Sequence, residues 1–389
     1  MISTTGAKCR PRNGTGPETE ALRRCTIAGI DCIAARGAHN SQSSLTVKLL
    51  PGESLVDLFR RLSMALKELD ASILQLTVFG STSASAEADE AMRRVFGGVD
   101  WPVTWVEGAS CDGSPIAGVQ VCALAGGAVQ RIVQNERIVG SVFEEGGAWH
   151  CVLGGVGPRE IRWNGAQQTR ETIENMQAAL GQAGFSFGDV VRTWFFLDDI
   201  LSWYTEFNQV RTRMYSEHEF RSGSVPASTG IAGRNPAGAA LVAGAWAVQQ
   251  LSTLVRVQEV ASPLQCPAAI YGSSFSRAME ISDARCKRLL VSGTASVGQE
   301  GATVHGGNAR AQVAFAMKNV AAILESRGMS FADVTRATAY FTKAENAPIF
   351  AEWLARHGSG ALPAVCACCD ICRPDLHFEI ELDAVQFGG

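Results

Sequence analysis

The last hydrophobic segment of the chain carries three carboxylates at alternate positions. Glu379, Glu381 and Asp383 lie in HFEIELDAV, among apolar residues that are typical of a β-strand. Side chains at alternate positions of a strand share one face. Burial of such a face raises a carboxyl pKa, which keeps the acid protonated near neutral pH, as general-acid catalysis requires. The alternative is that all three carboxylates lie on a solvated face.

Four cysteines lie just before this strand, in the segment CACCDIC. Their spacing is not a usual zinc pattern, and no second cluster supplies a matching pair. Along a strand, Cys366 and Cys368 point one way and Cys369 the other, so four thiolates do not converge. We therefore expect no metal site. Cys372, seven residues before Glu379, is either part of a reactive site or a buried small hydrophobe.

A pattern of helix, strand, helix, proline and strand occurs three times, and its third copy positions these residues. In that copy an amphipathic stripe over 313–324 predicts a helix, and the β-branched and aromatic segment 334–341 predicts a strand. A second helical stripe at 349–354 precedes Pro363, which prevents the helix from continuing. Repetition at this scale indicates three similar structural units in one chain.

The first two copies repeat these elements without the carboxylates. Where the third copy has HFEIELDAV, the second has GAALVAGAWAV and the first has AGVQVCALA. We therefore expect one cleft of three to carry a chemical task. The predicted elements are helices at 173–180 and 203–214 and a strand at 190–197 in the second copy, helices at 55–69 and 92–96 and a strand at 73–79 in the first, and glycine-bearing strands at 151–157 and 289–298.

The predicted fold class is α+β, with three modules that each lay two helices on one face of a small sheet. Three such modules around an axis bury the other faces of their sheets. We predict modules at 26–135, 136–258 and 259–389, with the first one degenerate, and linkers near 128–140 and 251–266. Residues 1–25 are rich in Gly, Pro, Thr and Arg and are predicted to be a disordered lead-in.

Composition excludes several functional classes. The 389 residues carry a net charge of −4, which does not indicate a nucleic-acid-binding surface. The longest apolar run, Ala239–Val248, is about half the length of a membrane-spanning helix, and the N-terminus lacks the apolar region of a signal peptide. Twelve cysteines without an export signal indicate reduced thiols in a cytoplasm.

The repeated unit resembles the YjgF-like (Rid) fold, whose members form trimers with ligand clefts between subunits. Residues 140–389 are more closely similar to the chorismatases, which resemble that trimer fused into one chain. The blocks that carry this similarity are VVRTWFFLDDILSWYTEFNQVRTRMY, VPASTGIAGRNPAGAAL, SSFSRAM, LLVSGTASV and CDICRPDLHFEIE. The resemblance implies cleavage of the enolpyruvyl ether of chorismate with release of pyruvate.

The resemblance also implies roles for Glu379 and Cys372. Glu379 matches the glutamate with which chorismatases protonate the enolpyruvyl methylene carbon, and an enol ether resists nucleophiles until that carbon is protonated. A cysteine at the spacing of Cys372 belongs to the active site of those chorismatases that make 3-hydroxybenzoate. We therefore expect 3-hydroxybenzoate as the product. The alternatives are a dihydroxycyclohexadiene carboxylate, formed by chorismate hydrolysis, and a mixture of 3- and 4-hydroxybenzoate.

The two carboxylates of chorismate require guanidinium groups or equivalent donors. Arg211 and Tyr215 are expected on one helical face, and a glycine in the segment Ser292–Thr294 permits close approach of the backbone. Each arginine has a surface or interdomain ion pair as its alternative role, and each phenylalanine has a place in the core as its alternative. The candidate substrate-binding residues within the similar blocks are Arg211, Tyr215, Arg234, Arg277, Arg213, Phe275, Thr294 and Phe378.

Two rival functions remain, an enamine/imine deaminase of the general YjgF-like type and a metabolite-binding protein without catalysis. Such deaminases hold the substrate carboxylate with an arginine directly after Pro-Ala. In this chain Val365 follows Pro363-Ala364 and Ser228 follows Pro226-Ala227, so that arginine is absent. Protonation and elimination need no cofactor, and we expect none. A fused pseudo-trimer satisfies its own interfaces, so we expect a monomer.

Overall fold

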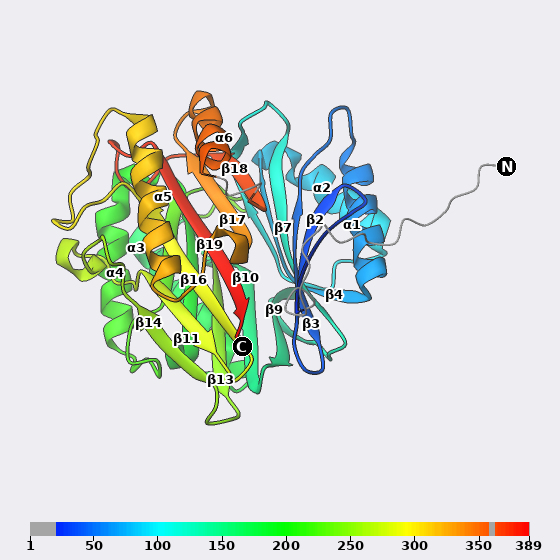
Figure 1. The fold of residues 1–389 in the computed structure, drawn as a ribbon. Coiled ribbons are helices and arrows are strands. Elements are labelled where there is room, and N and C mark those ends of the chain that lie inside the picture. The colour runs from blue at the N-terminus through cyan, green and yellow to red at the C-terminus, as the bar shows by residue number, and fades with distance from the viewer. Residues whose placement is uncertain (1–20, 358–361, 389) are drawn as a thin grey trace.

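The computed structural model describes residues 21–357 and 362–388, which form three β-sheets arranged around a common axis. Each sheet carries two helices on its outer face, and the inner faces of the sheets meet in the middle of the molecule (Figure 1). The protein is therefore an α+β fold of three fused modules. None of the helices in the described residues is both long and apolar enough to cross a membrane.

The first module is complete, although its sequence pattern is faint. Its helices are α1 (Leu55–Leu69) and α2 (Ser85–Phe96). Its sheet has the order β1 (Leu22–Ile27), β2 (Ile30–Arg36), β3 (Ser41–Val47), β7 (Ile116–Ala125), β4 (Ala71–Gly80) and β5 (Val103–Val106). The expected degeneracy therefore concerns the sequence of this module and not its set of elements.

The second module has helices α3 (Gly165–Gln182) and α4 (Ile200–Ser216). Its strands run in the order β12 (Ala227–Ala232), β11 (Val190–Leu197), β13 (Leu241–Gln250), β10 (Ala148–Val156), β9 (Arg137–Glu145) and β8 (Gln130–Gln134). The predicted strand at 190–197 is confirmed by β11, all of whose residues are buried.

The third module has helices α5 (Ala309–Glu325) and α6 (Ala347–Arg356). Its strands run in the order β14 (Arg256–Val260), β15 (Ala278–Ser282), β16 (Cys286–Ala295), β19 (Phe378–Phe387), β17 (Val334–Phe341), β18 (Ala364–Cys368) and β6 (Ala109–Ser110). The last of these, β6, comes from the first module. The predicted stripe of α5 is fully buried, and each such apolar side chain contributes about 1.5–3 kcal/mol.

The two predicted linkers overlap the connections between the sheets, at 126–129 and 251–255, but extend too far into the following modules. The predicted linker at 128–140 contains β8 and the start of β9, and the one at 251–266 contains β14. These are edge or near-edge strands with exposed polar side chains, so their sequences lack a clear apolar alternation. In the lead-in, residues 1–20 lie outside the described residues, whereas Leu22–Cys25 belong to β1, which pairs with β2.

The strand registers establish the pseudo-threefold relation between the modules. Phe79, Phe196 and Tyr340 lie at matching positions, each in the strand after its module's first helix. Phe79 makes edge-to-face contacts with Phe196 at 6.1 Å and with Tyr340 at 6.0 Å between ring centroids. The three rings therefore meet where the inner faces of the sheets converge.

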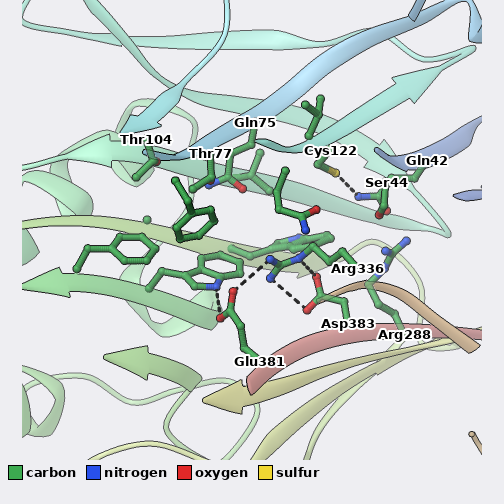
Figure 2. Close-up of a pocket in the computed structure, with 18 residues that line it drawn as sticks. Gln42, Ser44, Gln75, Thr77, Thr104, Cys122, Arg288, Arg336, Glu381 and Asp383 are labelled. Carbon is green, nitrogen blue, oxygen red and sulfur yellow. Dashed lines mark hydrogen bonds and ion pairs between the residues drawn. The ribbon is translucent and has the colours of Figure 1, made fainter. Parts of the chain in front are cut away.

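Charged side chains surround a cavity of about 40 Å³ near this axis. In Figure 2, Arg336 lies between Glu381 and Asp383, and Gln42, Gln75, Thr77 and Arg288 line the same cavity. Arg336 Nη1 lies 3.2 Å from Glu381, and its Nε lies 2.6 Å from Asp383. Burial of these carboxylates is thus accompanied by ion pairing, as buried charges require.

Candidate active site

A cleft between the second and third modules contains the first of the three alternating carboxylates, and we call it the Glu379 cleft. Its cavity measures about 240 Å³, near the lower end of the range for small-molecule sites. The second module contributes α4 and β12, and the third contributes β16, β19 and the loops around them. The lining residues are Tyr204, Thr205, Asn208, Arg211, Ser228, Gly230, Tyr271, Ser273, Phe275, Arg277, Gly293, Ala295, Val297, Cys372, Arg373, Leu376 and Glu379.

Backbone pairing closes the seam beside this cleft. Ala227 and Ser276 form an isolated parallel bridge, and the amide of Ser276 donates to the carbonyl of Pro226. The amide of Ser228 donates to Ser292 Oγ at 2.8 Å. The two modules therefore hold opposite walls of the cleft at a defined separation.

Glu379 lies near the start of β19, paired with Ala295 on one side and Tyr340 on the other. Only 5 % of its surface is exposed, and no residue that the structure describes makes a hydrogen bond with its carboxyl group. Burial, together with the charge of Glu381, raises the pKa of Glu379 to about 8. The side chain is therefore mainly a neutral carboxylic acid at pH 7, which is the form that donates a proton.

Gly293 makes room for this acid. A bulge between Val291 and Thr294 in β16 brings the glycine toward β19. A Cβ atom built on Gly293 falls 2.0 Å from Glu379 Oε1, far inside the distance of any real contact. The position therefore requires a glycine if the acid keeps this orientation.

Glu381, two residues along the same face of β19, has the opposite ionisation. It accepts hydrogen bonds from Arg192 Nη2 at 2.5 Å, Trp194 Nε1 at 2.8 Å and Thr229 Oγ1 at 2.5 Å. Although burial opposes ionisation, Arg336, Arg192 and the hydroxyl and indole donors lower the pKa of Glu381. Two neighbouring carboxyl groups thus take different protonation states, a pattern of functional sites.

Three guanidinium groups line the Glu379 cleft without a carboxylate partner among the described residues: Arg211, Arg277 and Arg373. Arg211 is 1 % exposed and donates to Asn208 Oδ1 at 2.6 Å and Ser228 Oγ at 3.3 Å. Arg277 is 4 % exposed and donates through Nε and Nη2 to the carbonyl of Cys266. A buried cation without an anion is costly, so this arrangement favours an anionic ligand.

Aromatic rings hold these guanidinium groups in place. Phe275 lies 5.4 Å from the guanidinium carbon of Arg277 and 5.8 Å from that of Arg211, measured to the ring centroid. Tyr271 lies 5.0 Å from Arg373 and 5.4 Å from Arg277. Such cation–π contacts restrict the side chains to planar, stacked positions.

Cys372 is half-buried in the loop between β18 and β19 and lines the same cavity. Burial and the neighbouring Glu379 raise the pKa of this thiol to about 12. The group is therefore a neutral thiol at pH 7 and a weak hydrogen-bond donor, not a thiolate nucleophile. The described residues contain no group of three or more His, Cys, Asp or Glu side chains that could hold a metal ion.

Comparison with known proteins places the chain in a family. The model of the endoribonuclease L-PSP family matches residues 155–256 and 268–386, which lie in the second and third modules. This chain belongs to the endoribonuclease L-PSP family. No functionally curated protein matches it.

Solved structures with the L-PSP family fold cover this chain to different extents. A chorismatase crystal structure has a TM-score of 0.61 and 19 % identity, covering 80 % of this chain and 93 % of its own. The YjgF gene product from E. coli has 22 % identity and a TM-score of 0.27, covering 33 % of this chain and 97 % of its own. Yeast Mmf1 has 20 % identity and a TM-score of 0.29, covering 33 % and 98 %. At this identity, the likeness to the chorismatase shows a shared three-module fold.

Within this L-PSP family chain, five of the ten candidate site residues line the Glu379 cleft. They come from α4, the segment before β15, the loop before β19 and β19 itself, and so from four separate parts of the sequence. They are Arg211, Phe275, Arg277, Cys372 and Glu379.

Three of the other candidates lie inside the protein, away from the cleft. Tyr215 lies one helical turn beyond Arg211, where it packs against Phe187 and Phe220 and its hydroxyl lies 3.3 Å from Thr193 Oγ1. Thr294 follows Gly293 and faces the opposite side of β16, where it donates to the carbonyl of Ser292. Phe378 precedes Glu379 and packs against Phe341 and Phe350 beneath the helices.

The remaining two arginines lie at the surface. Arg213 is two residues from Arg211 on α4 and therefore faces solvent. Arg234 is 68 % exposed in its side chain and pairs with Asp198 at 3.2 Å. Arg234 therefore has the ion-pairing role that was the alternative for each arginine, and Arg213 is exposed.

Sequence reasoning missed several residues of the cleft. Arg373 directly follows Cys372, and Asn208 lies three residues before Arg211 on the same helical face, so both positions carried a local signal. Tyr204, one turn earlier, follows the same periodicity. Tyr271 ends a short 3₁₀ helix, Ala268–Tyr271, and nothing in its sequence neighbourhood indicates where its ring points.

Proposed function

We propose that this protein is a chorismatase, which cleaves chorismate to pyruvate and 3-hydroxybenzoate with Glu379 as the acid. The observation that supports this most directly is a neutral carboxylic acid beside three guanidinium groups that have no carboxylate partner within residues 21–357 and 362–388. Chorismate has complementary chemistry, with two carboxylates and an enol ether that needs a proton. The shared fold with a chorismatase crystal structure agrees with this proposal.

In this proposal the cleft binds chorismate through its carboxylates. Arg211, Arg277 and Arg373 supply the charge-assisted donors, and Asn208 and Ser228 orient Arg211. Phe275 and Tyr271, which already stack on guanidinium groups, offer apolar edges to the six-membered ring. Binding of the dianion compensates the buried positive charge of the cleft.

The first chemical step is protonation of the enolpyruvyl methylene carbon by Glu379. The carbon–carbon double bond supplies the electron pair, and the ether oxygen stabilises the resulting cation as an oxocarbenium ion. Glu379 becomes a carboxylate beside that cation, which stabilises the charge that develops. The Arg192 and Arg336 pairs keep Glu381 ionised throughout, so a single carboxyl group exchanges the proton.

The second step releases pyruvate. The neighbouring ring hydroxyl attacks the carbon that bears the activated ether, the ring-carbon–oxygen bond breaks, and pyruvate departs as a ketone. The hydroxyl proton returns to Glu379, and the arene-oxide-like intermediate opens and loses a ring hydrogen to give 3-hydroxybenzoate. Cys372, as a neutral thiol, donates to the oxide oxygen during opening. The atoms of chorismate equal those of the two products, so no water is consumed.

The test is incubation of the purified protein with chorismate, with pyruvate measured by a coupled assay and the second product by mass. We expect pyruvate and 3-hydroxybenzoate in equal amounts, and no pyruvate from Glu379→Gln because an amide cannot deliver the proton. Glu352→Gln, at an exposed glutamate on α6, is the matched control and keeps full activity. Absence of pyruvate with the native chain refutes the proposal, and ammonia released from an imine-forming amino acid identifies a deaminase instead.

Cys372→Ala tests the product assignment separately. The proposal expects pyruvate release to change by less than about 3-fold, because Glu379 alone carries the first step. The ratio of 3-hydroxybenzoate to the other products, 4-hydroxybenzoate and the diene diol, changes instead. An unchanged product mixture assigns the opening step to another residue.

The proposed steps use proton transfer and elimination by the chain's own residues and need no cofactor. We also propose that the protein acts as a monomer in a cytoplasm, because the three modules already form the ring that separate subunits form in YjgF-like trimers. Sedimentation of the purified chain tests the oligomeric state.

A further inference from the structure

Two thiols meet where the first module contacts the third. Cys111 directly follows β6, and Cys368 is the last residue of β18. These strands are antiparallel, with Cys368 opposite Ala109. The two sulfur atoms lie 3.2 Å apart, although the residues are far apart in the chain. Both side chains are half-buried, so small reagents can reach them.

This contact lies at the seam of the molecule that the polypeptide does not bridge. The second module is connected by the chain to both neighbours, whereas the first and third modules meet only through non-covalent contacts. Besides the β6–β18 pairing, Thr46 Oγ1 donates to the carbonyl of Pro363 and Gln120 Nε2 donates to the carbonyl of Ala337. A bond between Cys111 and Cys368 therefore closes the ring of three modules covalently.

We propose that Cys111 and Cys368 form an oxidisable dithiol site, which a hydroperoxide converts to a disulfide that links the first module to the third. The Cys368 thiol attacks the peroxide oxygen, the oxygen–oxygen bond breaks, and a sulfenic acid and one water (or alcohol) form. The Cys111 thiol then attacks the sulfenic sulfur, and a second water leaves as the disulfide forms. Two thiols are oxidised and one peroxide is reduced, and both thiol protons leave in the products.

The order of attack follows from the surroundings of the two thiols. Burial and the hydrogen bond with Cys368 raise the pKa of Cys111, which makes it the poorer nucleophile toward a peroxide. Once Cys368 is a sulfenic acid, Cys111 is already in contact with the sulfur that it must attack. The two sulfur atoms, now 3.2 Å apart, have to approach to about 2.05 Å for the disulfide bond to form.

The resulting bond constrains a very long loop of the unfolded chain, from 111 to 368, and such loops give large gains in stability. It also fixes the end of β18, from which the chain continues into the loop that carries Cys372. The inference does not depend on the proposed reaction, because the site is outside the Glu379 cleft.

The experiment treats the reduced, full-length protein with hydrogen peroxide and maps its peptides under non-reducing conditions. We expect a cross-linked peptide pair that contains Cys111 and Cys368, reversed by a thiol reductant. We also expect the melting temperature of the oxidised protein to rise by roughly 3 °C or more. Cys111→Ser and Cys368→Ser each remove the cross-link and the rise.

Cys286→Ser is the control, because Cys286 is also half-buried and lies in a strand away from this seam. It keeps both the cross-link and the rise. A cross-link between Cys111 and Cys366 overturns the proposal. So does the absence of a disulfide between Cys111 and Cys368 at a peroxide dose that fully oxidises Cys286. A cross-link without a rise in melting temperature overturns its ring-closing role.

Discussion

Two clefts of this protein are built from matching elements, and they differ in what lines them. The Glu379 cleft uses α4 and β12 of the second module against β16 and β19 of the third. The cleft between the first and second modules uses α2 and β5 against β10 and β13, and we call it the Val242 cleft. Its cavity is larger, about 750 Å³ against about 240 Å³.

The registers align the two clefts position by position. Val242 pairs with Phe196 as Glu379 pairs with Tyr340, and β10 has a bulge where β16 has one. Four lining residues of α4 and four of α2 have the same spacing. In the Val242 cleft the counterparts of Glu379, Arg211, Cys372 and Arg373 are Val242, Met92, Asn235 and Pro236.

The comparison separates what the fold supplies from what the side chains supply. Both clefts are built from matching helices and strands, so these elements alone provide an opening between modules and no chemistry. The proposed activity instead requires the acid, its glycine neighbour and the unpaired guanidinium groups in one place. Exchanging residues between the clefts is therefore a direct way to test which of these features matter.

The largest expected effect comes from replacing the acid of the Glu379 cleft with its counterpart in the Val242 cleft. Glu379→Val removes the proton donor and places an apolar side chain at this buried position, so pyruvate release falls by roughly 10²–10⁴-fold or more. Val242→Glu, the reverse change, creates no second site, because Met92 and Pro236 replace Arg211 and Arg373, and the arginines of the Val242 cleft, Arg137 and Arg159, come from other elements. Substantial pyruvate release by Glu379→Val, measured at saturating chorismate, contradicts the assignment.

Arg211→Met gives the Glu379 cleft the residue type that the Val242 cleft has at the matching position, Met92. The variant removes a buried guanidinium from the carboxylate site, which lowers kcat/KM for chorismate by roughly 100-fold. Most of the loss is expected in KM, because the group binds substrate and not specifically the transition state. Arg213→Met, on the exposed side of the same helix, leaves kcat/KM unchanged. Equal losses in the two variants indicate damage to α4 and not to substrate binding.

Comparison of the predicted elements with the structure shows which features of the fold and the site were predictable from sequence. The strands at 190–197 and 334–341 match β11 and β17, because dense β-branched and aromatic residues favour central strands. The hairpin of β8 and β9 was missed, since polar edge strands resemble linkers. Burial against another module, which decides the Glu379 pKa, has no local sequence signal.

The face of the strand or helix on which a residue lies explains most of the misplaced site residues. Phe378 and Glu379 are adjacent on a strand, so they face opposite sides, and one of them had to lie in the core. The same holds for Gly293 and Thr294. The direction of Tyr271 and Arg373 depends instead on loop geometry, which the chain determines only after the modules have packed.

Gly293→Ala tests the space that the acid occupies. The added Cβ lies 2.0 Å from Glu379 Oε1 in the present orientation, so the carboxyl group has to move away from its position. Misplacement by about 1 Å reduces kcat by roughly 10–100-fold, with a smaller effect on KM. Gly181→Ala, where an added Cβ meets no atom within 4 Å, is the control and leaves kcat unchanged. A fully active Gly293→Ala variant shows that the acid works in another orientation.

The smallest expected effect is a displacement of the pH profile by Glu381→Gln. The raised pKa of Glu379, about 8, predicts that kcat/KM stays level up to that pH and falls above it, because the protonated acid is the active form. The charge of Glu381 is one cause of the raised pKa, so its removal lowers the pKa of Glu379. Arg192, which lowers the pKa of Glu379 and is left without this partner, acts in the same direction.

The falling limb of the profile therefore moves to lower pH, by roughly one unit. Activity well below pH 7 stays close to that of the native protein, since Glu379 is protonated in both. Asp89→Asn, at a carboxylate of the Val242 cleft that pairs with Arg93, leaves the profile in place. A limb that stays at its native position in Glu381→Gln shows that the two carboxylates of β19 act independently, and a limb that moves to higher pH shows that Glu381 lowers the pKa of Glu379 instead of raising it.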